Sequence, residues 1–120
     1  MKQFDRLGPK QVTFEDGQTM LLVVRQLGLR LPRLDETGIR TDKTAEAEFL
    51  RLGKIRARCL SNRATIAEEG REKGNSPERD RILRSLYIQN NYLLHMVDTN
   101  YQFVRATIEL AGDRLPEEKE

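Results

Sequence analysis

The sequence contains few of the residues that build catalytic and metal sites. Its 120 residues include one cysteine, Cys59, one histidine, His95, and no tryptophan. A single thiol excludes an intramolecular disulfide and a cysteine-based zinc site, and it is typical of a reducing compartment. His95 follows Asn91 and Tyr92, so it lacks the Glu-x-x-His pattern of a helical di-iron site. We therefore expect a cytoplasmic protein without a metal site, with His95 at the surface.

Long apolar runs and a charge excess are also absent. The longest apolar run covers residues 20–24, far short of the roughly 20 residues that a membrane-spanning helix needs. No apolar segment follows the basic residues near the N-terminus, so we expect neither a signal peptide nor a membrane partner. Lys and Arg total 21 against 19 for Asp and Glu, a net charge of +2. This balance argues against a protein that coats a polyanion.

The distribution of glycine and proline divides the chain. Residues 1–40 contain Gly8, Gly17, Gly28, Gly38, Pro9 and Pro32, whereas the region that follows is richer in helix formers. The length suits one domain over residues 1–120. Within it we predict a hairpin and loop element over 1–40, a helical hairpin over 41–112 and a solvated tail over 113–120.

The N-terminal region carries a hairpin signal. An Asp-Gly pair at residues 16–17 lies between a β-branched and aromatic run at 11–14 and an apolar run at 19–24. This pattern is typical of a β-hairpin, because glycine adopts positive φ without strain. We therefore predict a short N-terminal β-hairpin or irregular element, followed by a loop over 29–41.

A short helix over residues 19–27 is the competing interpretation of the same region. Met20, Val24 and Leu27 share one helical face, and Gly28 could end the helix. Short apolar runs do not distinguish strand from helix, so both interpretations stay open and the hairpin is favoured.

From residue 43 onward the pattern becomes helical. Residues 43–73 contain no proline and many strong helix formers, with Thr41 or Asp42 as the expected N-cap. Gly70 weakens the end of this helix, because glycine costs about 1 kcal/mol relative to alanine. Gly74 suits the position just after the helix, where left-handed backbone is common.

A second long helix is predicted to follow at once. Ser76 fits an N-cap and Pro77 fits the first helical position. The helical pattern then continues over 77–111 and is closed by Gly112. The sequence therefore predicts a mainly α protein built on a long antiparallel helical hairpin (about 43–73 and 77–111).

Two adjacent apolar rows on the second helix predict a partner-binding seam. Counted from Leu83 in alternating steps of four and three, one row meets the coiled-coil criterion over four heptads. The two rows together cover an arc of roughly 160° at 100° per residue, more than one antiparallel helix covers. We therefore expect oligomerisation to complete a helical bundle. The expected interface residues are Tyr87, Leu94, Val97, Tyr101, Val104 and Ile108 in one row and Leu86, Leu93, Met96 and Phe103 in the other.

The position of the turn predicts the register of the two helices. Counting outward from Asn75 places Asn62 near Asn90, where the two amides could form one polar layer. The same count makes Asp98 the nearest acid for Arg56, which lies inside the apolar arc and needs a partner. A buried Asn90 would fix the register of the pair, whereas a rim position would leave it in water.

A basic group on the first long helix has two interpretations. Arg51, Lys54 and Arg58 lie within about 60° on the outer face, and no acid occurs between residues 49 and 67. Such a stripe can contact the phosphates of a nucleic acid. It can also be an ordinary solvated face, which the low net charge and the lack of interleaved aromatic residues favour.

No motif in the sequence assigns a catalytic activity. There is no glycine-rich phosphate loop, no GxSxG and no cysteine–histidine nucleophile pair, so we predict a non-enzymatic protein without a cofactor. The leading hypothesis is a self-associating interaction module, an adaptor, assembly or structural subunit that pairs with itself as a dimer or larger homo-oligomer, or with another helical protein. The alternative is a small nucleic-acid-binding subunit that uses the basic face.

Overall fold

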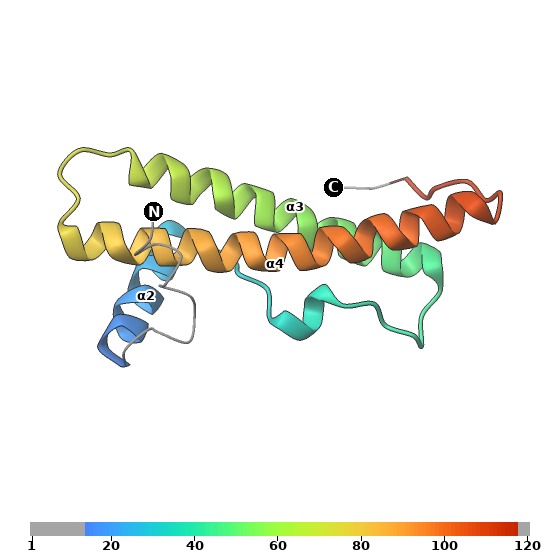
Figure 1. The fold of residues 1–120 in the computed structure, drawn as a ribbon, viewed down its shortest axis with the longest axis horizontal. Coiled ribbons are helices and arrows are strands. Elements are labelled where there is room, and N and C mark those ends of the chain that lie inside the picture. The colour runs from blue at the N-terminus through green and yellow to red at the C-terminus, as the bar shows by residue number, and fades with distance from the viewer. Residues whose placement is uncertain (1–13, 118–120) are drawn as a thin grey trace.

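The computed structural model describes residues 14–117, which are mainly helical and contain no strand. Helix α2 spans Phe14–Leu27, the 3₁₀ helix η2 spans Leu34–Thr37, α3 spans Ala45–Gly70 and α4 spans Pro77–Leu110. The two long helices run antiparallel and pack along most of their length, which gives an elongated molecule of 52 × 26 × 24 Å (Figure 1). The predicted long helical hairpin is therefore confirmed. None of the helices in residues 14–117 is long and apolar enough to cross a membrane.

Helix α4 is the central element, because other elements cover it on two sides. In Figure 1, α3 lies along one side, while α2 and the η2 segment lie against the other. Two apolar clusters fill the contacts. The first cluster contains Met20, Val23, Leu29, Ile66, Ile82, Leu83 and Leu86. The second cluster contains Phe49, Leu52, Ile55, Cys59, Val97, Val104 and Ile108.

The predicted N-terminal β-hairpin is wrong, because its turn and second strand belong to α2. Met20 and Val23 are buried against α4 while Leu21 and Leu22 are exposed, which is the period of a helix and not that of a strand. Gly17 lies inside the helix and does not have a positive φ, so the Asp-Gly turn is not used. Residues 11–13 of the predicted first strand lie outside the described residues.

The competing helix interpretation is confirmed, although the helix starts earlier than residue 19. Gly28 ends it with a φ of +64°. Its N–H donates to the Arg25 carbonyl at 3.2 Å, and the Leu29 N–H donates to the Val24 carbonyl at 3.0 Å. These two bonds form a Schellman motif, which satisfies carbonyls at the end of the helix. After this turn, Leu29 packs in the first cluster.

Helix α3 is shorter than predicted at both ends. Its N-cap is Thr44, not Thr41 or Asp42, and the Thr44 hydroxyl accepts a hydrogen bond from the Ala47 N–H at 3.1 Å. At the other end the helix stops at Gly70, not at residue 73. The Glu69 carbonyl at this end accepts hydrogen bonds from the Glu72 N–H at 3.2 Å and from the Asn75 side-chain amide at 2.9 Å, which satisfy it in place of a helical donor.

The start of α4 follows the prediction and its end differs by one residue. The Ser76 hydroxyl accepts from the Arg79 N–H at 3.0 Å, and Pro77 is the first helical residue. The helix ends at Leu110, and Gly112 follows with a φ of +78°. The segment after it is not wholly solvated as predicted, because Leu115 is half-buried against the second cluster. Residues 118–120 of the tail lie outside the described residues.

A buried polar layer separates the two apolar clusters. Asn62 and Asn90 are both buried, and the Asn62 amide donates to Asn90 Oδ1 at 3.3 Å. Asn90 Nδ2 donates to the Cys59 carbonyl at 2.8 Å. Two turns further along, Arg56 Nε lies 2.6 Å from Asp98 Oδ1. Both predicted pairings are confirmed, and Asn90 is a buried residue, not a rim residue.

We predict that Asn90→Leu destabilises the fold and that the neighbouring Asn91→Leu does not. The first change leaves the buried Asn62 amide without its acceptor, a loss of about 1–3 kcal/mol. Asn91 is a matched control, because its Oδ1 atom is buried with no hydrogen-bond partner among the described residues. Urea unfolding of the two variants and the wild type measures the difference. Equal stability of Asn90→Leu and wild type would show that the polar layer does not hold the register.

Candidate functional site

Most of the predicted interface residues belong to the core of the chain itself. Leu86, Val97, Val104 and Ile108 are buried in the two clusters. A further set is half-buried and packs against these clusters, namely Tyr87, Leu93, Leu94 and Tyr101. Only Met96, which is half-buried, and Phe103, which is exposed, stay outside the clusters. The two rows therefore serve first to pack α4 against α3, α2 and η2.

A different row of α4 stays open to solvent. It lies opposite Asn90, which contacts α3, and it advances from residue 92 in steps of four and three. Its members fall within roughly 80° of one another at 100° per residue. We call this row the outer stripe, and it consists of Tyr92, Met96, Thr99, Phe103, Ala106 and Leu110.

The outer stripe carries no charge, it is apolar apart from Thr99, and all its members except the half-buried Met96 are exposed. Tyr92, Phe103 and Leu110 are 53, 64 and 88% exposed. The Thr99 hydroxyl donates to the His95 carbonyl at 2.8 Å, so its hydrogen-bonding demand is met inside the helix. The stripe is about 27 Å long at the 1.5 Å rise of a helix. Met96 and Phe103 were predicted interface residues, and Leu110 continues the same row of the sequence pattern. A heptad count beginning at Tyr92 would have found the remaining members, Tyr92, Thr99 and Ala106.

Few charges border the outer stripe. By helical position, His95 and Gln102 lie along one edge, and Asn100 and Thr107 lie along the other. The charged side chains of this part of α4 are further round the helix. Arg105 and Glu109 pair with each other at 2.9 Å, and Asp98 pairs with Arg56. A helix that packs on the stripe therefore meets little charge.

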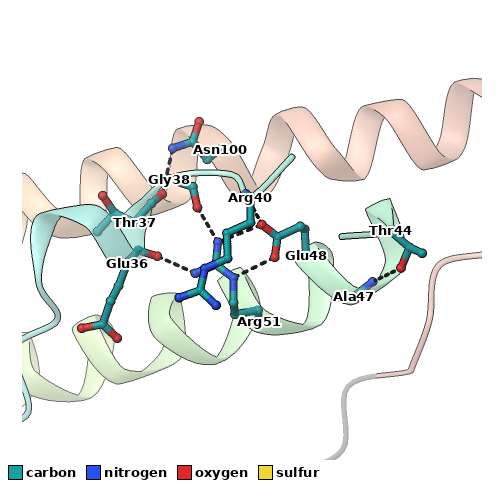
Figure 2. A network of polar contacts seen from close by, with 9 residues as sticks. All are labelled: Glu36, Thr37, Gly38, Arg40, Thr44, Ala47, Glu48, Arg51 and Asn100. Atoms are coloured by element: carbon teal, nitrogen blue, oxygen red, sulfur yellow. Dashed lines mark hydrogen bonds and ion pairs between the residues drawn. The ribbon is translucent and has the colours of Figure 1, made fainter. Parts of the chain in front are cut away.

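Arg51, the first residue of the predicted basic group, is occupied by a network within the chain (Figure 2). Its Nε lies 2.7 Å from Glu48 Oε2, and its Nη1 donates to the Glu36 carbonyl at 2.7 Å. Its Nη2 also donates to the Gly38 carbonyl. Figure 2 shows this guanidinium between Glu48 and the segment after η2. Arg51 thus holds that segment against α3 and is not a free phosphate contact.

Glu48 is the buried acidic partner in the network around Arg51. The residue is 2% exposed, and its carboxylate accepts from Arg51 and from the Arg40 backbone N–H. The hydrogen bond from Arg51 is the main cause that holds the pKa of Glu48 below its usual value, against the opposing effect of burial. Asn100 of α4 secures the same segment by donating to the Thr37 carbonyl at 2.8 Å.

Lys54 and Arg58, the other two basic residues, face a groove with a third cation. The groove has a volume of about 430 Å³ and lies between α3 and the segment that follows α2. Arg30 of that segment lines it together with Lys54, Arg58, Ser61 and Asn62. The structure therefore divides the predicted basic group and brings two of its members to Arg30.

A second groove contains the only histidine but no catalytic cluster. Arg56, Asp98, His95 and Asn91 line it, in a volume of about 350 Å³. Arg56 bonds Asp98 and also lies over the Tyr101 ring, 5.3 Å from its centroid. The hydrogen bond from Arg56 is the main cause that lowers the pKa of Asp98. The polar groups of this groove are thus arranged as a structural ion pair between α3 and α4.

The remaining candidate residue for chemistry, Cys59, is fully buried. Burial raises the pKa of its thiol, which keeps the thiol protonated and unreactive. Within residues 14–117, no three His, Cys, Asp or Glu residues gather closely enough to hold a metal ion.

Comparison with protein-family models, with curated proteins and with solved structures found no match to this chain. Two surface features of the chain are candidates for binding a partner, the outer stripe of α4 and the groove beside Arg30.

We predict that Glu48→Gln removes part of the acid sensitivity of the fold. A carboxyl whose pKa is lowered in the folded state stabilises the fold above its unfolded pKa, and this contribution is lost as the pH falls through the folded pKa. The wild type therefore loses stability from about pH 4.5 downward, and Glu48→Gln shows a shallower loss. At neutral pH the variant is less stable, by up to about 3 kcal/mol, because a buried pair is broken.

Asp98→Asn is the matched control for this prediction. Its pKa is lowered as well, but its side chain is 42% exposed, so solvent screens its ion pair. Chemical unfolding at neutral and acidic pH compares the two variants with the wild type. If Asp98→Asn flattens the pH dependence more than Glu48→Gln, the network around Arg51 is not the main acid-sensitive contact.

Proposed function

We propose that the protein is a non-enzymatic helical interaction module that associates with a second copy of itself along the outer stripe of α4. The observation that carries this proposal is the combination of heptad spacing, absence of charge and high exposure in one row of a long helix. Large apolar side chains grouped in one strip on a soluble protein mark an association surface, whereas single exposed ones do not.

The spacing of the stripe favours a helix as the partner. Alternating steps of four and three residues place side chains on a line that a second helix can follow. The stripe covers two and a half heptads, which suits a short helix pair inside a bundle and not a long rod.

The same surface can pair with itself. In a two-fold dimer each copy offers the same residues, so the patch must complement itself. An uncharged stripe with almost uncharged edges meets this condition, since two copies bring no like charges into contact. The resulting assembly has two α4 helices at its centre and an α3 helix on the outer side of each, a four-helix arrangement.

We predict that Phe103→Glu dissociates the assembly without unfolding the chain. The change places a charge in the middle of an apolar contact, and we expect the dissociation constant to rise about tenfold or more. Phe103 is 64% exposed within one chain, so the helical content stays unchanged. Light scattering over a range of concentrations measures the mass, and circular dichroism measures the helical content.

Leu22→Glu is the matched control. Leu22 is 57% exposed and receives the same charge, but it lies on α2 and outside the outer stripe. We expect this variant to keep the wild-type mass. A wild type that is monomeric at every concentration would overturn the proposal, as would equal dissociation by Leu22→Glu and Phe103→Glu.

A further inference from the structure

We infer that the groove between α3 and the segment after α2 binds phosphate groups. It is open to solvent, has a volume of about 430 Å³ and is lined by Arg30, Lys54, Arg58, Ser61 and Asn62, with small residues between them. This inference concerns a different surface from the outer stripe and does not depend on self-association.

Three positive charges in this groove are not neutralised by any residue in the described range 14–117. The side chains of Arg30, Lys54 and Arg58 make no hydrogen bond or ion pair with any described residue, and no lining residue is acidic. Like charges that share one concave surface repel each other, and the cleft concentrates their field. An anion in the groove relieves this repulsion.

Two of the other three basic residues of α3 are paired within the chain. Arg51 is bound by Glu48 and two carbonyl groups, and Arg56 is bound by Asp98. Both of these guanidinium groups contribute to holding the fold. Lys54 and Arg58 lie on the same helix, but their side chains hold no other part of the described structure in place.

The segment that supplies Arg30 is fixed in place. Gly28 turns the chain with its positive φ, and the following residue, Leu29, is buried. The Arg30 N–H then donates to Asn62 Oδ1 at 3.2 Å, and Asn62 is itself held by Asn90. The backbone at Arg30 is therefore anchored to α3 before any ligand arrives, which lowers the entropic cost of binding.

The chemistry of the lining residues favours phosphate. Guanidinium groups donate pairs of hydrogen bonds to phosphate oxygens, a lysine supplies a point charge, and the exposed Ser61 hydroxyl can donate one more bond. No aromatic side chain lines the groove, so it offers no surface for base stacking. The groove thus recognises phosphate itself, whether in the backbone of a nucleic-acid strand or in a small polyphosphate.

The test compares two double variants that remove equal charge. Lys54→Gln with Arg58→Gln removes two cations of the groove. Arg63→Gln with Lys73→Gln removes one arginine and one lysine that are exposed, lie outside the groove and pair with no residue of 14–117. The probes are a short fluorescent oligouridylate strand, followed by anisotropy, and inorganic tripolyphosphate, followed by calorimetry. Circular dichroism verifies that both variants keep the wild-type helical content.

We expect the groove variant to bind about tenfold more weakly than wild type at low salt, and the control variant to lose less than about twofold. For the strand, the slope of log affinity against log salt should shrink by about 1.4, the value for two lost contacts to single-stranded phosphate. If the wild type binds the oligouridylate strand much more tightly than tripolyphosphate, the ligand is a nucleic-acid backbone. If it binds the two probes with equal affinity, the ligand is a small polyphosphate.

Two results would overturn the inference. One is that the wild type binds neither probe at low salt. The other is that the groove variant and the control variant lose the same affinity, since this would show attraction to net charge alone and no site at the groove.

Discussion

The buried contact between Asn62 and Asn90 is the constraint on which the rest of the structure depends. It lies between the two apolar clusters and fixes which turn of α3 faces which turn of α4. A slide by one turn would place both amides against apolar side chains and leave them unpaired, at a cost that apolar packing does not recover. The pairing of Arg56 with Asp98 depends on this register, and so does the position of Arg30, whose N–H is held by Asn62. One polar layer thus connects the core to the groove at the surface.

The parts of the fold that the sequence predicts are those with long periodicity. Two helices of 26 and 34 residues carry enough turns for the apolar pattern to define a face. The position of the turn near Asn75 then predicts which residues of the two helices lie side by side. The prediction for the N-terminal element was wrong because it depended on a local signal, the Asp-Gly pair. An Asp-Gly pair favours a turn, but the burial of Met20 and Val23 against α4 is a tertiary contribution that outweighs it.

The surface features were harder to predict for a related reason. Arg51, Lys54 and Arg58 look equivalent by helical angle, but Arg51 is bound by backbone carbonyls of the η2 segment, whose position no local pattern gives. Glu48, three residues before Arg51, was the one available signal of that pairing. For α4 the sequence shows a broad apolar arc, but only the fold shows which side the neighbouring elements cover. Most residues of the predicted seam on α4 are part of the core, and the exposed outer stripe lies on another face of the same helix.

The two proposed surfaces are built from opposite physical properties. The outer stripe offers apolar area without charge, and the groove offers charge without a large apolar or aromatic side chain. They share no residue, so pairing along the stripe does not use the residues that line the groove. Self-association would then place two phosphate sites on one particle, which favours a ligand long enough to reach both, because the second contact becomes intramolecular. A strand of nucleic acid is long enough to reach both sites and a small polyphosphate is not. Self-association along the stripe would therefore strengthen the binding of a strand but not that of a small polyphosphate.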